Sequence, residues 1–148
     1  MPTIWTIGYE KLLAPELVQE LDDAGIERLL DVRFRPQSRR AGLSKTRLGE
    51  ALADRRIAYE HRRALGTPPD IRIDFQQGRI AQGRARMAQH LEETAGEAID
   101  ALADELQADP PGPRTALLCL EHDPAVCHRR VVTEALAARI PDLEVVDL

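Results

Sequence analysis

The chain has 148 residues, of which 43% are hydrophobic and 30% are charged, and its formal net charge is -5. This length suits one domain, expected over residues 1–148, and no apolar stretch approaches the roughly 20 residues of a membrane span. Two cysteines form no disulfide framework, and no basic, apolar leader opens the chain. We therefore expect a cytoplasmic protein with no membrane association.

Positive charge is concentrated in residues 33–86, which hold fourteen Lys and Arg against five Asp and Glu. That leaves a net +9 in this segment and -14 on the rest of the chain. Such segregation suggests a face for anions, either the phosphates of a small ligand or a nucleic-acid backbone. Arginines solvated on helix surfaces would explain the charges at 55, 56, 62 and 63 equally well.

The first half of the chain predicts a strand, a helix and a second strand, followed by one more helix and a third short strand. Residues 3–7 are β-branched and aromatic, and residues 15–24 carry apolar side chains at helical spacing between a proline and a glycine. The five expected elements cover residues 3–7, 15–24, 26–32, 44–55 and 57–59.

The pattern weakens over residues 63–83, where we expect a loop, and then becomes helical again over residues 87–107 with a break about Gly96. A proline-rich turn separates that helix from the most apolar run in the chain. The last three expected elements are a strand at 115–120, a helix at about 124–139 and a strand at 143–146.

Alternating strands and helices indicate an α/β fold, here a single three-layer domain with a mostly parallel sheet of about five strands. We expect the Rossmann-like order 3-2-1-4-5, with the first strand in the centre. The loops after the first, second and fourth strands, at residues 8–10, 31–40 and 121–130, should then meet at one edge of the sheet.

Both cysteines and two of the four histidines fall within residues 115–130. If a helix begins at Pro124, Cys127 lies in its first turn, where the helix dipole, His128 and Arg129 would favour the thiolate. Cys127 is therefore a candidate catalytic residue, although a buried structural cysteine is the commoner fate of a free thiol. Cys119 lies inside the apolar strand and is expected in the core.

His128 is a further candidate catalytic residue. Neighbouring side chains on a helix do not face each other, so it should serve a partner other than Cys127, such as Asp31, Glu121 or the ligand, or make a structural hydrogen bond. A metal site could be assembled from Cys119, His122, Cys127 and His128. Their spacing matches no familiar zinc pattern, and a strand-interior Cys119 would face the wrong way. We therefore expect no metal site.

The loop after the second strand predicts an anion pocket. Asp31 and Arg33 are followed by Ser38 and Arg39 beside a proline, and arginine forks bind phosphate or carboxylate at two points. Tyr9 and Arg129 are candidate ligand-binding residues from the other two loops. Asp31 and Glu121 are candidate acid/base residues. The alternative is that ion pairs, Arg33 with Asp31 or Arg39 with Glu121, only hold the loops together.

The motifs at these loops resemble those of the uncharacterised proteins grouped as domain of unknown function 488. The resemblance covers essentially the whole chain and implies a single α/β domain, but it implies no reaction. Its residues are Thr6-Ile7-Gly8-Tyr9-Glu10, Asp31-Val32-Arg33 with Pro36, Ser38 and Arg39, Gly42-Leu43-Ser44-Lys45, Leu65-Gly66, Leu118-Cys119-Leu120-Glu121, Asp123-Pro124 and Cys127-His128-Arg129.

The common nucleotide, hydrolase and metalloprotease signatures are absent from the sequence, and aromatic residues make up only 3% of it. The sequence favours an enzyme or binding protein with an arginine-lined pocket for a phosphate-bearing or other anionic ligand, which nucleic acid could supply. Two alternatives stay open: a non-catalytic adaptor domain and a rhodanese-like, thiol-dependent transferase that uses Cys127. The sequence indicates no particular cofactor and no oligomeric state.

Overall fold

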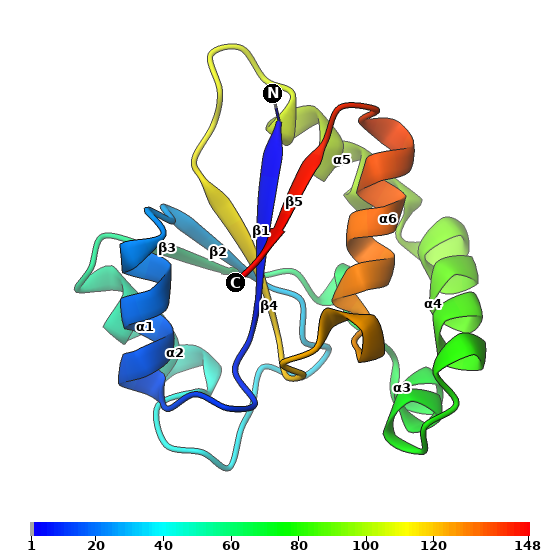
Figure 1. Cartoon of the computed structure of the whole chain (residues 1–148), viewed down its shortest axis with the longest axis horizontal. Coiled ribbons are helices and arrows are strands. Elements are labelled where there is room, and N and C mark those ends of the chain that lie inside the picture. Colours follow the sequence, from blue (N-terminus) through cyan, green and yellow to red (C-terminus); the bar gives the residue numbers. More distant parts are fainter. Residues whose placement is uncertain (1) are drawn as a thin grey trace.

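A computed structural model describes residues 2–148, so Met1, the first residue of the expected domain, lies outside the described residues. The chain alternates strands and helices as predicted (Figure 1). The strands are β1 (Thr3–Gly8), β2 (Arg28–Asp31), β3 (Ala58–His61), β4 (Thr115–Cys119) and β5 (Glu144–Asp147). The α-helices are α1 (Ala14–Asp23), α2 (Lys45–Ala53), α3 (Pro69–Gln76), α4 (Ile80–Thr94), α5 (Gly96–Leu106) and α6 (Arg129–Arg139), with short 3₁₀ turns η1 (Arg63–Leu65) and η2 (Pro124–Val126).

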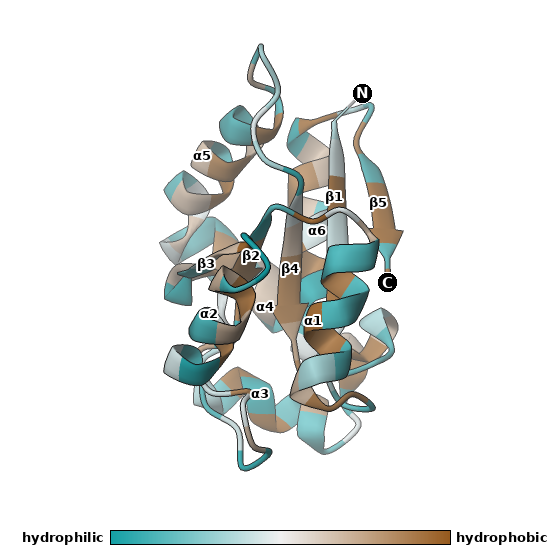
Figure 2. Cartoon of the chain, turned by 90° about the vertical axis from the view of Figure 1, so that its left-hand side faces the viewer, coloured by the Kyte–Doolittle hydropathy of each residue, from teal (hydrophilic) through white to brown (hydrophobic). Residues whose placement is uncertain are grey.

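The five strands form one parallel sheet, which confirms the predicted α/β class. The order is β3-β2-β4-β1-β5, so the expected order 3-2-1-4-5 is wrong at its centre. β4 is buried at all five positions, whereas β1 is partly exposed at Thr3 and Trp5. A central strand is covered on both faces and takes the most continuous apolar run, which is β4. Figure 2 shows this strand as a largely hydrophobic ribbon between β2 and β1.

Two apolar cores lie on opposite faces of the sheet. Leu118 of β4 faces α1 and α2, and the adjacent Leu117 faces the layer formed by α3 to α6. This alternation follows from the two-residue period of a strand. Full burial of one such leucine side chain stabilises the fold by roughly 1.5–3 kcal/mol.

Residues 63–83 are not the loop that the sequence predicts, because α3 and the start of α4 lie there. The buried face of α3 consists of Ile71 and Asp74, and the Asp74 carboxylate pairs with Arg79 at 2.8 Å and with Arg86 at 2.7 Å. A helix whose inward face includes a neutralised carboxylate lacks the apolar period by which helices are recognised.

The helix after β4 also begins later than predicted. Pro124–Val126 form a 3₁₀ turn, Cys127 is extended with φ -121° and ψ 146°, and α6 starts at Arg129. Cys127 therefore precedes the helix and does not lie in its first turn.

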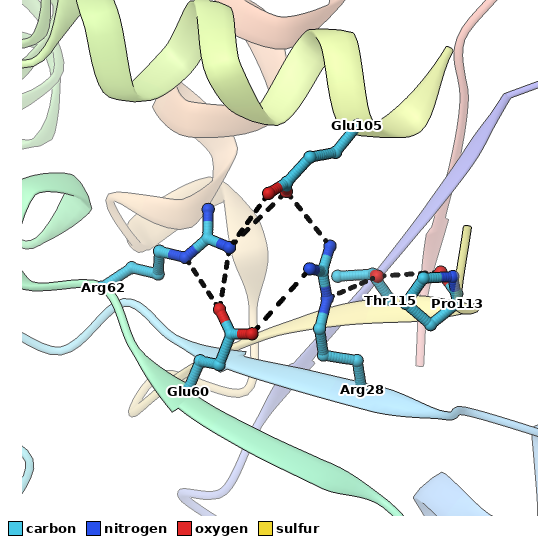
Figure 3. A network of polar contacts seen from close by, with 6 residues as sticks. All are labelled: Arg28, Glu60, Arg62, Glu105, Pro113 and Thr115. Atoms are coloured by element: carbon cyan, nitrogen blue, oxygen red, sulfur yellow. Dashed lines mark hydrogen bonds and ion pairs between the residues drawn. The ribbon is translucent and has the colours of Figure 1, made fainter. Parts of the chain in front are cut away.

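An ion-pair network attaches α5 to the sheet (Figure 3). Arg28 of β2 donates to Thr115 Oγ1 of β4 at 3.1 Å and pairs with Glu105 of α5 at 3.3 Å. Arg62 joins Glu105 to Glu60 of β3 at 3.4 and 2.7 Å. Charges that look free in the sequence are therefore partly used to hold the two layers together.

Elsewhere too, cations of residues 33–86 are neutralised by carboxylates. Six of the fourteen form ion pairs: Arg33, Arg55, Arg62, Arg79, Arg84 and Arg86. The net charge of the segment therefore overstates the positive charge available to a ligand. Within residues 2–148, no helix combines the length and the apolar character needed to cross a membrane.

Candidate functional site

A cavity of about 40 Å³ lies at the carboxyl edge of the sheet, where the loops after β1, β2 and β4 meet as predicted. A fourth segment, from η1 to α3, also contributes to its wall. The cavity is lined by Tyr9, Arg33, Phe34, Arg35, Gln37, Thr67, Arg72, Phe75, Cys119, Leu120, Glu121 and His128.

Two glycines let the walls of this cavity come together. A Cβ atom on Gly8 would lie 1.7 Å from the Glu121 carbonyl oxygen, and one on Gly66 would lie 2.6 Å from the Phe34 backbone nitrogen. The absence of a side chain therefore lets the β1 and β4 loops touch, and lets η1 pack on the β2 loop.

Asp31 and Arg33 form a buried ion pair in the floor of the β2 loop. Arg33 donates to the Asp31 carboxylate from Nε at 2.9 Å and from Nη2 at 2.7 Å, and its Nη1 donates to the Leu43 carbonyl at 2.7 Å. Tyr59 Oη donates to the same carboxylate at 2.5 Å, and both charged side chains are buried. Asp31 thus holds Arg33, as the ion-pair alternative predicts, and it does not line the cavity.

Burial and the bonds to Asp31 together set the pKa values of Arg33 and Tyr59. Burial acts to lower the pKa of Arg33, but its bonds to Asp31 outweigh that effect and raise the pKa above its ordinary value. Burial, followed by the bond to the Asp31 carboxylate, raises the pKa of Tyr59 well above its ordinary value. Arg33 and Tyr59 therefore both stay protonated at neutral pH.

Arg40 holds the β1 loop against the β2 loop. Its guanidinium donates to the backbone carbonyls of Tyr9 and Leu12 at 2.6 Å and of Glu10 at 2.8 Å. Arg40 is not among the site residues that the sequence predicts, although it directly follows Arg39, which is.

Arg129 has the same role for the β4 loop. It is fully buried, and its guanidinium donates to the Glu121 carbonyl and, at 3.1 Å, to the His122 carbonyl. Like Arg40, it binds backbone oxygens and does not reach the cavity lining.

Two more predicted ligand-binding residues lie outside the cavity. The Ser38 hydroxyl accepts from the Arg40 backbone N–H at 3.1 Å, which closes a turn in the β2 loop. Arg39 is exposed, and its side chain makes no hydrogen bond or ion pair within residues 2–148. The expected pairing of Arg39 with Glu121 is therefore not formed.

Cys119, Cys127 and His128 come together at the inner end of the cavity. His128 Nδ1 lies 3.2 Å from Cys119 Sγ and 3.9 Å from Cys127 Sγ, and Glu121 Oε2 lies 3.6 Å from Cys119 Sγ. Cys127 and His128 point to one place because Cys127 is extended rather than helical, which corrects the expectation that they diverge. Cys119 and His128 line the cavity and Cys127, 1% exposed, does not.

The protonation states of this group depend on one another. Burial raises the pKa of Cys119 well above its ordinary value, and the neighbouring Cys127 raises it further. Burial alone would also raise the pKa of Cys127, but the Cys119 hydrogen bond and the positive charges of His128 and Arg129 lower it well below its ordinary value. One thiolate shared near His128 is therefore favoured over two.

Glu121 and His128 respond to that thiolate. Burial and then Cys127 raise the pKa of Glu121 to about 7. Burial opposes protonation of His128, but Cys127 and the bond to the Val32 carbonyl outweigh it and raise the pKa of His128. Glu121 thus lies beside the cavity as a carboxyl group that exchanges protons near neutral pH.

Thr67 and Arg72, which sequence reasoning missed, lie in the cavity wall with side chains that have no protein partner. Thr67 Oγ1 is buried and makes no hydrogen bond, and within residues 2–148 the side chains of Arg72 and Arg35 make no hydrogen bond or ion pair. Leu65-Gly66 was noted as a motif, and its position next to Thr67 was the available signal.

The chain matches the family model described as domain of unknown function DUF488 over residues 14–136. No curated protein and no solved structure matches it. The chain belongs to the DUF488 family of domains of unknown function.

Proposed function

We propose that the cavity at the carboxyl edge of the sheet binds the anionic group of a small molecule. The observation that carries this proposal is Thr67, a cavity-lining residue that is 4% exposed and whose buried hydroxyl has no protein partner. A buried polar atom without a partner costs about 1–3 kcal/mol, so its presence favours a ligand oxygen at that position.

The charge of the lining supports an anion. Arg35 and Arg72 bring two positive charges that no carboxylate neutralises, whereas the charge of Arg33 is balanced by Asp31. Glu121 is the single carboxylate in the wall. The balance is positive, and guanidinium groups bind phosphate and carboxylate oxygens at two points.

The size of the cavity limits what is bound. A buried water needs roughly 10–15 Å³, so a cavity of about 40 Å³ holds about three waters or one small anionic group. Arg35 and Arg72 are exposed on its outer side and would contact a larger portion of the ligand outside. A phosphate or carboxylate group carried by a larger molecule matches this shape best.

Cys119, His128 and Glu121 line the same cavity, so a bound anion would lie against a thiol, an imidazole and a carboxyl group. This supports an enzyme over a purely adaptor domain. A rhodanese-like transferase would need Cys127 at the cavity surface, and the 1% exposure of Cys127 gives that alternative no support.

A small molecule is preferred to nucleic acid as the source of the anion. Six arginines of residues 33–86 are already paired with carboxylates, which reduces the continuous positive surface that a nucleic-acid backbone needs.

The test is thermal unfolding with increasing inorganic phosphate, sulfate and adenosine monophosphate, followed by calorimetric titration of the strongest binder. Wild type should be stabilised, because a ligand that binds only the folded state raises its stability. Arg72→Ala and Thr67→Val should weaken binding, the arginine change by about 10- to 100-fold, since a hydrogen bond to a charged group contributes about 1.5–3 kcal/mol.

Arg39→Ala is the matched control, because Arg39 is an exposed arginine of the neighbouring loop that makes no contact with the cavity. It should bind as wild type does. The proposal is refuted if none of the three anions stabilises wild type, or if Arg39→Ala weakens binding as much as Arg72→Ala. A steep fall of affinity for DNA or RNA with salt, unaffected by Arg72→Ala, would instead indicate a separate nucleic-acid surface.

A further inference from the structure

Three metal-ligating side chains converge beneath the cavity. The Sγ atoms of Cys119 and Cys127 and a ring nitrogen of His128 all lie within 4.8 Å of one another, and all three residues are buried. This spacing is close to what one ion needs, because zinc bonds to sulfur and nitrogen are about 2.3 and 2.0–2.1 Å long.

The orientation of His128 is the second observation. Its Nε2 lies 2.8 Å from the Val32 carbonyl oxygen and so donates its proton there. Nδ1, the nitrogen near both sulfurs, is then free to give its lone pair. Metal-ligating histidines almost always have this arrangement, with one nitrogen on the metal and the other donating to a carbonyl or carboxylate.

The backbone explains why no metal pattern is recognisable in the sequence. Cys119 ends β4 with its side chain on the face that holds His128, so the expectation that Cys119 faces the wrong way is incorrect. The η2 turn and the extended Cys127 bring the next two residues back to the same point. A spacing of eight residues followed by an adjacent pair resembles no standard zinc motif, but the tertiary structure joins the three ligands.

We propose that Cys119, Cys127 and His128 bind one soft divalent metal ion, with Zn²⁺ as the best match. Two thiolates and an imidazole select zinc over magnesium or calcium, which prefer oxygen ligands. Ion binding releases two protons to solvent, the thiol proton of Cys119 and the proton that the Cys127–His128 pair holds, so that two thiolate sulfurs and the neutral Nδ1 bond to the metal.

The fourth position of such an ion opens toward the cavity, because Cys119 and His128 line it. Three protein ligands with an open fourth position are typical of catalytic rather than structural zinc. Glu121 lines the same cavity and has its Oε2 3.6 Å from Cys119 Sγ. The metal site depends on residues other than Arg72 and Thr67, so it does not require the anion proposal to hold.

The experiment is a titration of the reduced, chelator-treated chain with Co²⁺, followed by displacement with Zn²⁺. Tetrahedral cobalt with thiolate ligands should give a sulfur-to-metal charge-transfer band and intense visible bands that saturate at one equivalent. Cys119→Ser and Cys127→Ser should each weaken binding by more than about 100-fold, because loss of a residue that only hydrogen-bonds to a metal ligand already costs about 10- to 100-fold.

His122→Ala is the matched control: His122 lies in the same segment, is exposed, and stands outside the cluster. It should keep the full cobalt spectrum, and so should Arg72→Ala even if anion binding is lost. If the cysteine variants do not fold, cadmium NMR of the wild-type chain tests the two thiolate ligands without any substitution.

The proposal is overturned if folded, reduced wild type gives no cobalt spectrum, or if the spectrum survives both cysteine substitutions. It is equally overturned if His122→Ala abolishes the spectrum, or if the cadmium resonance indicates no thiolate ligand.

Discussion

Substitution of Asp31 by Asn tests whether this residue is structural rather than an acid/base group. The wild-type carboxylate accepts from the Arg33 side chain at 2.7 and 2.9 Å, from the Arg33 backbone N–H at 3.0 Å and from Tyr59 Oη at 2.5 Å. The amide introduced by Asp31→Asn would offer one acceptor oxygen, turn an N–H₂ group toward these donors and leave the buried Arg33 cation without a counter-ion.

The expected loss follows from burial. Asp31 is 0% and Arg33 5% exposed, and removal of one partner of a buried ion pair costs about 3–5 kcal/mol. For a domain of this length, 1 kcal/mol corresponds to about 2–4 °C in the unfolding midpoint. Asp31→Asn should therefore lower the midpoint by about 6–20 °C.

Urea unfolding, followed by far-ultraviolet circular dichroism, measures the free energy, and a thermal scan measures the midpoint. Asp22→Asn is the control, because it breaks an ion pair with Arg55 in which both side chains are more than two-fifths exposed. Such exposed pairs contribute about 0–1 kcal/mol. If Asp31→Asn costs no more than Asp22→Asn, the structural role assigned to Asp31 is wrong.

Two further predictions concern the contacts that shape and support the cavity. Gly8→Ala would place a Cβ atom 1.7 Å from the Glu121 carbonyl oxygen, so it should lower the free energy of unfolding measured in urea by about 3 kcal/mol or more. Gly112→Ala is the control, because its Cβ would have its nearest contact at 3.7 Å and the substitution should be near neutral. Equal effects of the two substitutions would contradict the close approach of the β1 and β4 loops. The hydrogen bonds from Arg86 and Arg79 lower the pKa of Asp74 in the folded state. The pairing therefore stabilises the fold fully above the unfolded-state pKa of about 3.9, and this stabilisation is lost as the pH falls through the lower folded-state pKa. The stability difference between wild type and Asp74→Asn should therefore shrink from about pH 6 to about pH 3, and a constant difference would show that the charge of Asp74 is not responsible.

Local patterns in the sequence determined the elements and the edge of the sheet at which the candidate site lies. The apolar run before Cys119 predicted a buried strand, and Gly8, Asp31 and Glu121 were correctly placed at strand ends that share one edge. This worked because hydrophobic period and chain direction are local properties, and parallel strands bring their carboxyl ends together. The ion pair of Asp31 with Arg33 was also within reach, since the two residues are two positions apart.

Strand order and the composition of the cavity wall were decided only by the tertiary structure. Whether β1 or β4 is central depends on which strand buries more apolar surface between two helical layers, and no single segment contains that comparison. Thr67 and Arg72 reach the cavity because Asp74, neutralised by Arg79 and Arg86 of the following segment, lets α3 pack inward.

The cysteine segment shows the same division. Its sequence marked Cys127 and His128 as reactive residues, but a helical reading separated their side chains. One extended residue between η2 and α6 turns both toward Cys119. The sequence by itself determined which chemical groups are present and at which edge of the sheet they lie, while the tertiary structure decided which of them meet, because side-chain convergence depends on backbone angles set by long-range packing.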